Sequence, residues 1–269
     1  MNRTFRWVGT FTLCLLLTQT PVWAQSRESL YQVSTINALL IGLYDGETTF
    51  TDLLRHGDFG LGTVDQLDGE LIVLDGVAYH VTADGAVHQL PGEQTTPFAA
   101  VTFFEPDLSG ALPAGMSLPE LQQALDLLLP SPNIFYAIKI TGTFAYVKTR
   151  SVPKQENKPY PILSEIVKTQ PEFEFNSIQG TLVALRAPQF VEGINVPGYH
   201  FHFLTHDLRG GGHVLELETL SGQVEIDLTH QFEMLLPNSQ DFYEADLRSD
   251  DLDEVENPKS TLRLYSTIK

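Results

Sequence analysis

The sequence predicts an α+β protein dominated by mixed β-sheet or barrel, with a few helices. Two observations support this class. Beyond residue 25, most of the chain consists of short β-branched and apolar runs separated by Gly, Pro, Asn and Asp, which is typical of strands and turns. Helical periodicity is confined to a few short stretches. Each half also has a helix, then strands, then a Tyr-His pair (Tyr79-His80 and Tyr199-His200), which suggests an internal duplication.

The N-terminal half contains two predicted helices and several predicted strands. Residues 48–55 form a short capped helix. In the helix over 117–129, Ser117 is the cap, Glu120 occupies the capping-box position and the leucines share one face. Asp75-Gly76 is a strong hairpin signal between two strands. The β-branched and apolar runs of this half are 33–43, 70–74, 77–81, 97–104 and 133–148.

Residues 151–161 break both periodicities and are predicted to be a linker. This linker divides the chain into an N-terminal α+β domain over 25–160 and a β-rich domain with a C-terminal tail over 161–269. A short helix is expected over 162–168, and the acidic stretch from Asp241 is expected to form a helix or an ordered tail. The predicted strands of the second half are 173–187, 198–206, 213–220, 223–229 and 231–236.

The composition indicates a globular protein and makes nucleic acid a poor candidate partner. The chain has 269 residues, 42% hydrophobic and 19% charged, which is sufficient for one large or two modest domains. The 16 Lys and Arg against 34 Asp and Glu give a formal charge of −18. A protein this acidic lacks the general positive charge that binding to a phosphate backbone needs.

Residues 1–24 have the pattern of a secretory signal peptide. Two arginines precede a short apolar run over 11–17, and Pro21-Val22-Trp23-Ala24 supplies a small-residue cleavage site. Because the run is well short of the roughly 20 residues that a membrane span needs, we expect cleavage rather than a permanent anchor. The expectation is an exported protein, periplasmic or extracellular, with no membrane part after cleavage. The only cysteine, Cys14, lies in this segment, so the mature chain would have no cysteine-ligated metal and no cysteine nucleophile.

One segment carries the residues of a candidate metal site. Four of the eight histidines lie between residues 200 and 213. Because side chains alternate along a strand, His200 and His202 should face one way, while Phe201 and Phe203 should face a core.

The Gly-rich segment after Asp207 allows the chain to reverse and to return His213 on the neighbouring strand. Three imidazoles would then converge and leave an open position for water or substrate. His206 shares the strand period, so it would be a fourth ligand or lie near the turn. Imidazole ligands suit Zn, Cu, Fe and Ni. The alternative is a hairpin with solvated histidines.

Several longer blocks extend the pattern in order from about residue 29 to about residue 256. They are Gly57-Asp58-Phe59-Gly60-Leu61-Gly62-Thr63, Leu67-Asp68-Gly69-Glu70-Leu71, Phe103-Phe104-Glu105-Pro106-Asp107, Phe135-Tyr136-Ala137-Ile138-Lys139-Ile140 and Val147-Lys148-Thr149-Arg150. Together with Gly198-Tyr199-His200-Phe201-His202-Phe203 and Gly211-Gly212-His213, they resemble the α-acetolactate decarboxylase family.

The resemblance implies a zinc enzyme that converts the 2-hydroxy-3-keto acid (S)-2-acetolactate to (R)-acetoin and carbon dioxide, in the acetoin and butanediol branch from pyruvate. It also implies an α+β fold of two related domains and a homodimer. By the same resemblance, the Zn²⁺ ligands would be His200, His202 and His213, and His206 would not be a ligand.

The resemblance also assigns residues around the metal. Glu70 matches the family's active-site glutamate, and Thr63 matches a threonine that would bind substrate. Arg150 matches an arginine with a catalytic and substrate-binding role. The family has a further glutamate near its C-terminus, for which Glu256 is the first choice here and Glu254 the second.

The chemistry of this decarboxylation requires groups of these kinds. Loss of carbon dioxide leaves an electron pair that must delocalise into the ketone, and a Lewis acid can stabilise that charge. Arg150 offers a planar fork for a carboxylate or an oxyanion, although a surface arginine at a strand end would read the same in sequence. Delivery of a proton to one face requires a positioned acid, and Glu70 or Glu256 could serve. Without the resemblance, Glu70 would be read as an exposed strand residue.

Two other functions are compatible with part of this pattern. A cupin-like metalloenzyme also uses histidines on strands, but it needs a second ligand block, and only His230 follows His213. A secreted metal- or ligand-binding module without catalysis would have a closed coordination sphere, with His206 as a fourth ligand. The blocks of Glu70 and Arg150 would then be scaffold only.

Overall fold

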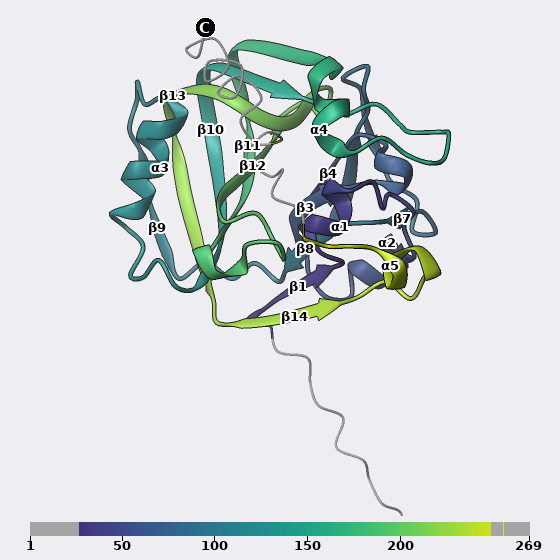
Figure 1. The fold of residues 1–269 in the computed structure, drawn as a ribbon. Coiled ribbons are helices and arrows are strands. Elements are labelled where there is room, and N and C mark those ends of the chain that lie inside the picture. Colours follow the sequence, from purple (N-terminus) through teal and green to yellow (C-terminus); the bar gives the residue numbers. More distant parts are fainter. Residues whose placement is uncertain (1–26, 249–254, 256–269) are drawn as a thin grey trace, which may run out of the picture.

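The computed structural model describes residues 27–248 and Val255. The predicted signal peptide over 1–24 lies outside the described residues, as do Glu254 and Glu256. Two β-sheets lie side by side with short helices around them, which confirms the α+β class (Figure 1). In the described part of the chain, no helix is both long enough and apolar enough to cross a membrane.

The first sheet has seven strands, all antiparallel to their neighbours except for one parallel pair at the edge. The predicted hairpin is confirmed, and its turn residues Asp75 and Gly76 have φ of 51° and 78°, as a type I′ turn requires. In order across the sheet, the strands are β14 (Gln231–Leu235), β1 (Ser29–Val33), β8 (Ala99–Thr102), β3 (Phe59–Thr63), β4 (Glu70–Leu74), β5 (Val77–Val81) and β6 (Val87–Gln89).

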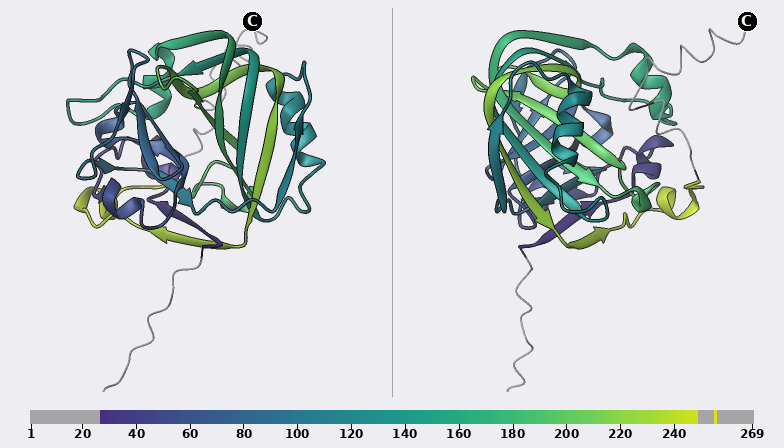
Figure 2. Two further views of the ribbon diagram at one scale, coloured as in Figure 1. Left: turned by 180° about the vertical axis from the view of Figure 1, so that it is seen from behind. Right: turned by 90° about the vertical axis from the view of Figure 1, so that its left-hand side faces the viewer.

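The second sheet is a closed barrel of four strands with a fifth strand at its side. It closes because β10 pairs with both β11 and β13 (Figures 1 and 2). The strands are β10 (Phe135–Arg150), β11 (Glu172–Ala187), β12 (Gly198–Thr205), β13 (Gly211–Thr229) and β9 (Leu108–Leu112). A separate short pair joins β2 (Thr48–Thr49) to β7 (Thr95–Thr96).

The helices are short, and two of them confirm predicted caps. In α3 the backbone N–H of Ser117 donates to the carboxylate of Glu120 (2.8 Å), and in α2 Thr49 accepts from the backbone N–H of Asp52. The helices are α1 (Ile36–Leu40), α2 (Phe50–Leu53), α3 (Leu118–Asp126), α4 (Leu163–Ile166) and α5 (Gln240–Glu244), with 3₁₀ turns η1 (Asp65–Leu67), η2 (Val167–Thr169) and η3 (Gln189–Val191).

Two predicted runs have a different form in the structure, and the strands β3, β6 and β9 lie outside every predicted run. The apolar run over 33–43 is the end of β1 followed by α1, because Ser34 adopts a positive φ of 63° and Thr35 caps the new helix by accepting from Ala38 N–H. The strands predicted over 213–220 and 223–229 are one continuous strand, β13. Pairing with β10 continues through Gly222, whose register partner is Gly142 and whose missing side chain allows the two backbones to lie close together.

Strand pairing crosses the domain boundary that the sequence predicts at residue 160. Strand β10 comes before the linker but belongs to the barrel, and β14 comes after it but pairs with β1 of the first sheet. Each sheet is therefore completed by a strand from the other half of the sequence. The loop over 151–161 connects β10 to α4.

The barrel strands contribute to two of the apolar clusters that hold the sheets together. On one face of the barrel, Phe201 and Phe203 pack with Leu121 and Leu125 of α3, which lies across the long strands (Figure 2). The opposite face packs against the seven-stranded sheet, and its members include Val183, Leu185, Leu61 and Ile72. Side chains of β12 that alternate with Phe201 and Phe203 therefore point into the junction between the two sheets.

Asp227 is a buried carboxyl near this junction, and we expect it to make stability depend on pH. Its side chain is 3% exposed and accepts from the backbone N–H of Glu105. Burial, reinforced by the charges of Glu28, Asp107 and Glu105, raises the pKa of Asp227 to about 7.

A folded-state pKa above the unfolded value means that this group favours folding at low pH, and the contribution is lost as pH rises toward 7. Asp227→Asn should therefore unfold at higher denaturant than the wild type at about pH 8, with a gain of about 1–2 kcal/mol that shrinks toward about pH 4. Denaturant titrations at both pH values measure the difference. A gain that is the same at both would contradict the prediction.

Candidate metal centre

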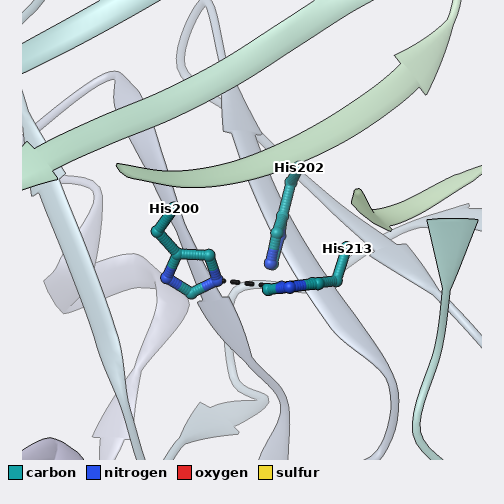
Figure 3. Close-up of side chains that lie close together, drawn as sticks. All are labelled: His200, His202 and His213. Atoms are coloured by element: carbon teal, nitrogen blue, oxygen red, sulfur yellow. Dashed lines mark hydrogen bonds between the residues drawn. The ribbon is translucent and has the colours of Figure 1, made fainter. Parts of the chain in front are cut away.

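Three histidines converge at the junction between the two sheets. His200 and His202 lie on β12, His213 lies on β13, and His202 and His213 are direct register partners. One nitrogen of each ring lies within 4.8 Å of the corresponding nitrogens of the other two. Figure 3 shows the three rings pointing toward one another. The predicted alternation along β12 is confirmed, because Phe201 and Phe203 pack on the opposite face.

The first sheet fixes the orientation of the central imidazole. His202 Nδ1 lies 2.8 Å from the backbone carbonyl oxygen of Leu71 on β4, so Nδ1–H is the donor. In the neutral ring, Nε2 then carries a lone pair, and it lies 3.4 Å from Oε2 of Glu70. A histidine that donates one N–H to a carbonyl and presents the other nitrogen is typical of a metal ligand.

All three imidazoles are held neutral. Burial lowers the pKa of His202 to about 3 and lowers the pKa values of His200 and His213 well below their ordinary value. The positive charge of Arg150 acts in the same direction on all three rings. Since a metal binds unprotonated imidazole, the environment keeps this triad in its ligating form at neutral pH.

The donor set fits a divalent metal ion. Among the residues that the structure describes, neither His202 Nε2 nor His200 Nδ1 has a hydrogen-bond partner, although both are buried. His202 Nε2 lies 3.4 Å from the Glu70 carboxylate, and a cation bound at this nitrogen would satisfy its lone pair. Three neutral imidazoles and no sulfur ligand suit Zn, Cu, Fe or Ni.

Glu70 is placed by a tight turn at the start of β4. Its register partner Thr63 donates a hydrogen bond from Oγ1 to the carbonyl oxygen of Gly69 (2.7 Å). Gly69 N–H donates to the carbonyl oxygen of Val152 (3.0 Å), and the ring of His80 contacts the carbonyl oxygen of Asp68. Glu70 is 7% exposed, so it is not the exposed strand residue that its sequence alone would suggest.

Gly69→Ala should destabilise the protein and displace Glu70. Gly69 has a φ of 74°, and an added Cβ would lie 2.1 Å from the carbonyl oxygen of Val81. We expect a loss of about 2–4 kcal/mol in unfolding free energy, from the left-handed backbone and the clash together.

Gly115→Ala is the matched control, because Gly115 has a similar φ of 77° but open space around it. Denaturant unfolding of both variants separates the two causes. Equal losses in the two variants would mean that the close approach to Val81 has no cost.

Arg150 is a buried residue beside the triad rather than a surface arginine. It ends β10, is the register partner of His213 and is 4% exposed. Its Nη1 donates to the amide oxygen of Gln170 (3.0 Å), while its buried Nε has no hydrogen-bond partner among the described residues. The site therefore combines a histidine triad that could hold a metal ion, a carboxylate and a guanidinium, supplied by both sheets.

His206 lies outside this group. It is exposed beyond the end of β12, and its backbone N–H donates to the carbonyl oxygen of Gln179. Within the described residues the cluster has three histidines, which disagrees with the closed four-histidine sphere expected of a pure binding module. His230, the one histidine that a cupin-like site could add, is exposed and also outside the cluster.

Glu256 and Glu254, the two candidates for a C-terminal active-site acid, lie outside the described residues. Val255 between them is described. Its side chain is 2% exposed and packs in an apolar cluster with Leu39, Leu40 and Tyr44.

Sequence reasoning missed the groups that hold the site residues in place. They are the Leu71 carbonyl, Gln170 and His80. A backbone carbonyl carries no sequence signal. Gln170 and His80 lie far in sequence from the residues that they support, so no local pattern identifies them.

Comparison with known proteins shows one consistent similarity. A family model described as Alpha-acetolactate decarboxylase matches residues 30–249. An alpha-acetolactate decarboxylase from Methanosarcina mazei is 53% identical over 234 residues, covering 86% of this chain and 81% of the relative. One from Methylococcus capsulatus is 45% identical over 230 residues, covering 84% of this chain and 88% of the relative.

Solved structures also match the fold of this chain. The crystal structure of alpha-acetolactate decarboxylase from Bacillus subtilis strain 168 matches with a TM-score of 0.82 and 40% identity, covering 85% of this chain and 98% of that one. A Staphylococcus aureus protein of unknown function, described as similar to alpha-acetolactate decarboxylase, matches with a TM-score of 0.81 and 33% identity, covering 86% of this chain and 99% of that one.

Proposed function

The chain belongs to the alpha-acetolactate decarboxylase family, and we propose that it converts (S)-2-acetolactate to (R)-acetoin and carbon dioxide. The observation that carries the proposal is the triad of histidines, two of them buried and one half-buried, with Glu70 3.4 Å from His202. Arg150 beside them supplies a positive charge for an anionic substrate. The partner of the site is then a small 2-hydroxy-3-keto acid.

We propose Zn²⁺ as the cofactor, held by His200, His202 and His213. When bound, Zn²⁺ supplies a Lewis acid that stabilises the negative charge left when carbon dioxide departs. The hydrogen bond from His202 to Leu71 fixes the tautomer in which Nε2 is available. Burial of all three rings keeps protons from competing for the ligand nitrogens.

Arg150 and Thr63 are proposed to bind the substrate. The guanidinium of Arg150 can form two parallel hydrogen bonds to a carboxylate, and its burial strengthens that attraction because water is excluded. Thr63 is the register partner of Glu70, so the two side chains share one face of the β3–β4 pair. The Thr63 hydroxyl donates to the carbonyl oxygen of Gly69 and lies next to the Glu70 side chain.

Glu70 is proposed to deliver the proton that replaces carbon dioxide. Its carboxyl is buried, placed by a rigid turn and directed at the triad, which meets the geometric requirement for a general acid. Glu256 is the second candidate for this role, on the family resemblance alone.

The reaction and its metal dependence can be tested together. Purified protein would be assayed for acetoin release from racemic acetolactate as isolated, after chelation, and after Zn²⁺ is restored. Acetoin formation that chelation removes and Zn²⁺ restores is expected. Bound metal without acetoin formation would contradict the proposed reaction, and acetoin formation that is unaffected by complete metal removal would contradict the cofactor.

We also propose that the protein is exported to the periplasm or the outside after cleavage behind Ala24, since residues 1–24 have a signal-peptide pattern. The N-terminal sequence of the protein recovered from cell fractions tests this. A soluble intracellular protein that retains Met1 would contradict it.

A homodimer is proposed on the family resemblance. Light scattering coupled to size-exclusion chromatography should give about twice the chain mass of 30.0 kDa, or slightly less after cleavage. A monomer at micromolar concentration would contradict this proposal.

A further inference from the structure

The buried guanidinium of Arg150 has a neutral partner. In the described part of the chain its side chain donates to one group, the amide oxygen of Gln170 (Nη1···Oε1 3.0 Å). No carboxylate of the described residues forms an ion pair with it. Buried arginines are ordinarily paired with carboxylates, because an unpaired buried charge is costly. Because its partner among the described residues is neutral, those residues leave the positive charge of Arg150 uncompensated.

A carboxylate is close in the fold but is engaged elsewhere. Glu172 on β11 is the register partner of Arg150 on β10, so the two side chains start from opposite positions on neighbouring strands. The Glu172 carboxylate instead pairs with Lys148, two residues before Arg150 on the same strand (Nζ···Oε2 2.5 Å). The carboxylate that strand register places opposite Arg150 is therefore paired with Lys148.

The backbone holds Gln170 in place. It follows η2 and precedes Pro171, which favours its extended conformation (φ −64°, ψ 142°). The carbonyl oxygen of Pro171 accepts from the N–H of Ser151, the residue after Arg150. The residues that follow Arg150 and Gln170 are therefore joined by a backbone hydrogen bond, and the Gln170 amide oxygen accepts one guanidinium N–H beside it.

We propose that Gln170 is a specificity-determining residue for the reaction proposed above. It orients the guanidinium by accepting one N–H, and because it is neutral it leaves the charge of Arg150 to the carboxylate of the substrate. The inference rests on the proposed function for the identity of that substrate. The inference predicts that the site prefers anionic ligands to uncharged ligands of the same shape.

Gln170→Glu tests the inference, since it replaces the neutral acceptor by a carboxylate of the same size. The new carboxylate should pair with Arg150 and compete with the substrate. We expect KM for acetolactate to rise about 10–100-fold, the equivalent of one charge-assisted hydrogen bond, with a much smaller change in kcat. Inhibition by 2-hydroxyisobutyrate, which has a carboxylate, should weaken by a similar factor. Inhibition by uncharged acetoin should change less than about twofold.

Two further variants make the result decisive. Gln179→Glu introduces the same charge at an exposed position on β11, the strand that follows Gln170, and it should leave both inhibition constants unchanged. Gln170→Met keeps the size but removes the acceptor, and it should weaken 2-hydroxyisobutyrate by a smaller factor, about 3–10-fold. Thermal melting would verify that each variant is folded.

Equal weakening of the charged and the uncharged ligand in Gln170→Glu would overturn the inference, because it would indicate general distortion of the site. Unchanged constants for both ligands would overturn it as well. Binding of 2-hydroxyisobutyrate can be followed by calorimetry without turnover. A failure of the proposed reaction would appear as absent acetoin in the wild type, whereas a failure of this inference would appear only in the ratio of the two ligands.

Discussion

Replacing His202 with alanine is expected to remove the bound metal and to lower acetoin formation by about three orders of magnitude or more. His202 is the central histidine of the triad, is fully buried and is oriented by the Leu71 carbonyl on the other sheet. Loss of one imidazole leaves two, fewer than the three protein ligands that a catalytic Zn²⁺ ordinarily has. Metal content by elemental analysis and acetoin release by a colorimetric assay measure the two effects.

His206→Ala is the matched control for this prediction. His206 lies four residues further along the same segment, but it is exposed and outside the cluster. It should retain full metal content and activity. If His202→Ala kept both metal and turnover, the triad would not be the metal site. If His206→Ala lost metal, the coordination would have a fourth histidine and the open position required for substrate would be absent.

The histidine site could be predicted from sequence because its geometry is local. Alternation along β12 places His200 and His202 on one face, and a Gly-rich turn returns His213 beside them. The hairpin at Asp75-Gly76 and the capping box of α3 are also local patterns, and the structure has both. Such features are formed by residues that are close in sequence, so a local pattern is sufficient to predict them.

The rest of the site could not be derived from local pattern because it depends on pairing between distant segments. β10 closes the barrel against β13, and this pairing brings Arg150 opposite His213 across more than sixty positions of the chain. Periodicity also gave no account of burial: Glu70 and Arg150 would be read as exposed strand-end residues, yet both are buried where the sheets meet. Their assignment depended on the family resemblance.

The second large effect is expected for Glu70→Gln. This change keeps the size and the hydrogen-bonding shape of the side chain but removes its exchangeable carboxylic proton. We expect acetoin formation to fall about 10²–10⁴-fold, the usual contribution of a positioned general acid. Metal content should be retained, because the three histidines and the Leu71 contact are untouched. That combination separates this prediction from the one for His202.

The handedness of the product gives a second, independent measurement on Glu70→Gln. A proton delivered from a fixed carboxyl reaches one face of the planar carbon, whereas water in an open site can reach both. Chiral chromatography of the residual acetoin should therefore show less excess of the R enantiomer than the wild type gives. Glu93→Gln, at an exposed carboxyl in a loop, is the control and should change neither rate nor handedness. Full turnover with unchanged handedness in Glu70→Gln would exclude Glu70 as the proton donor. The same two measurements on Glu256→Gln would then decide whether the C-terminal glutamate has that role.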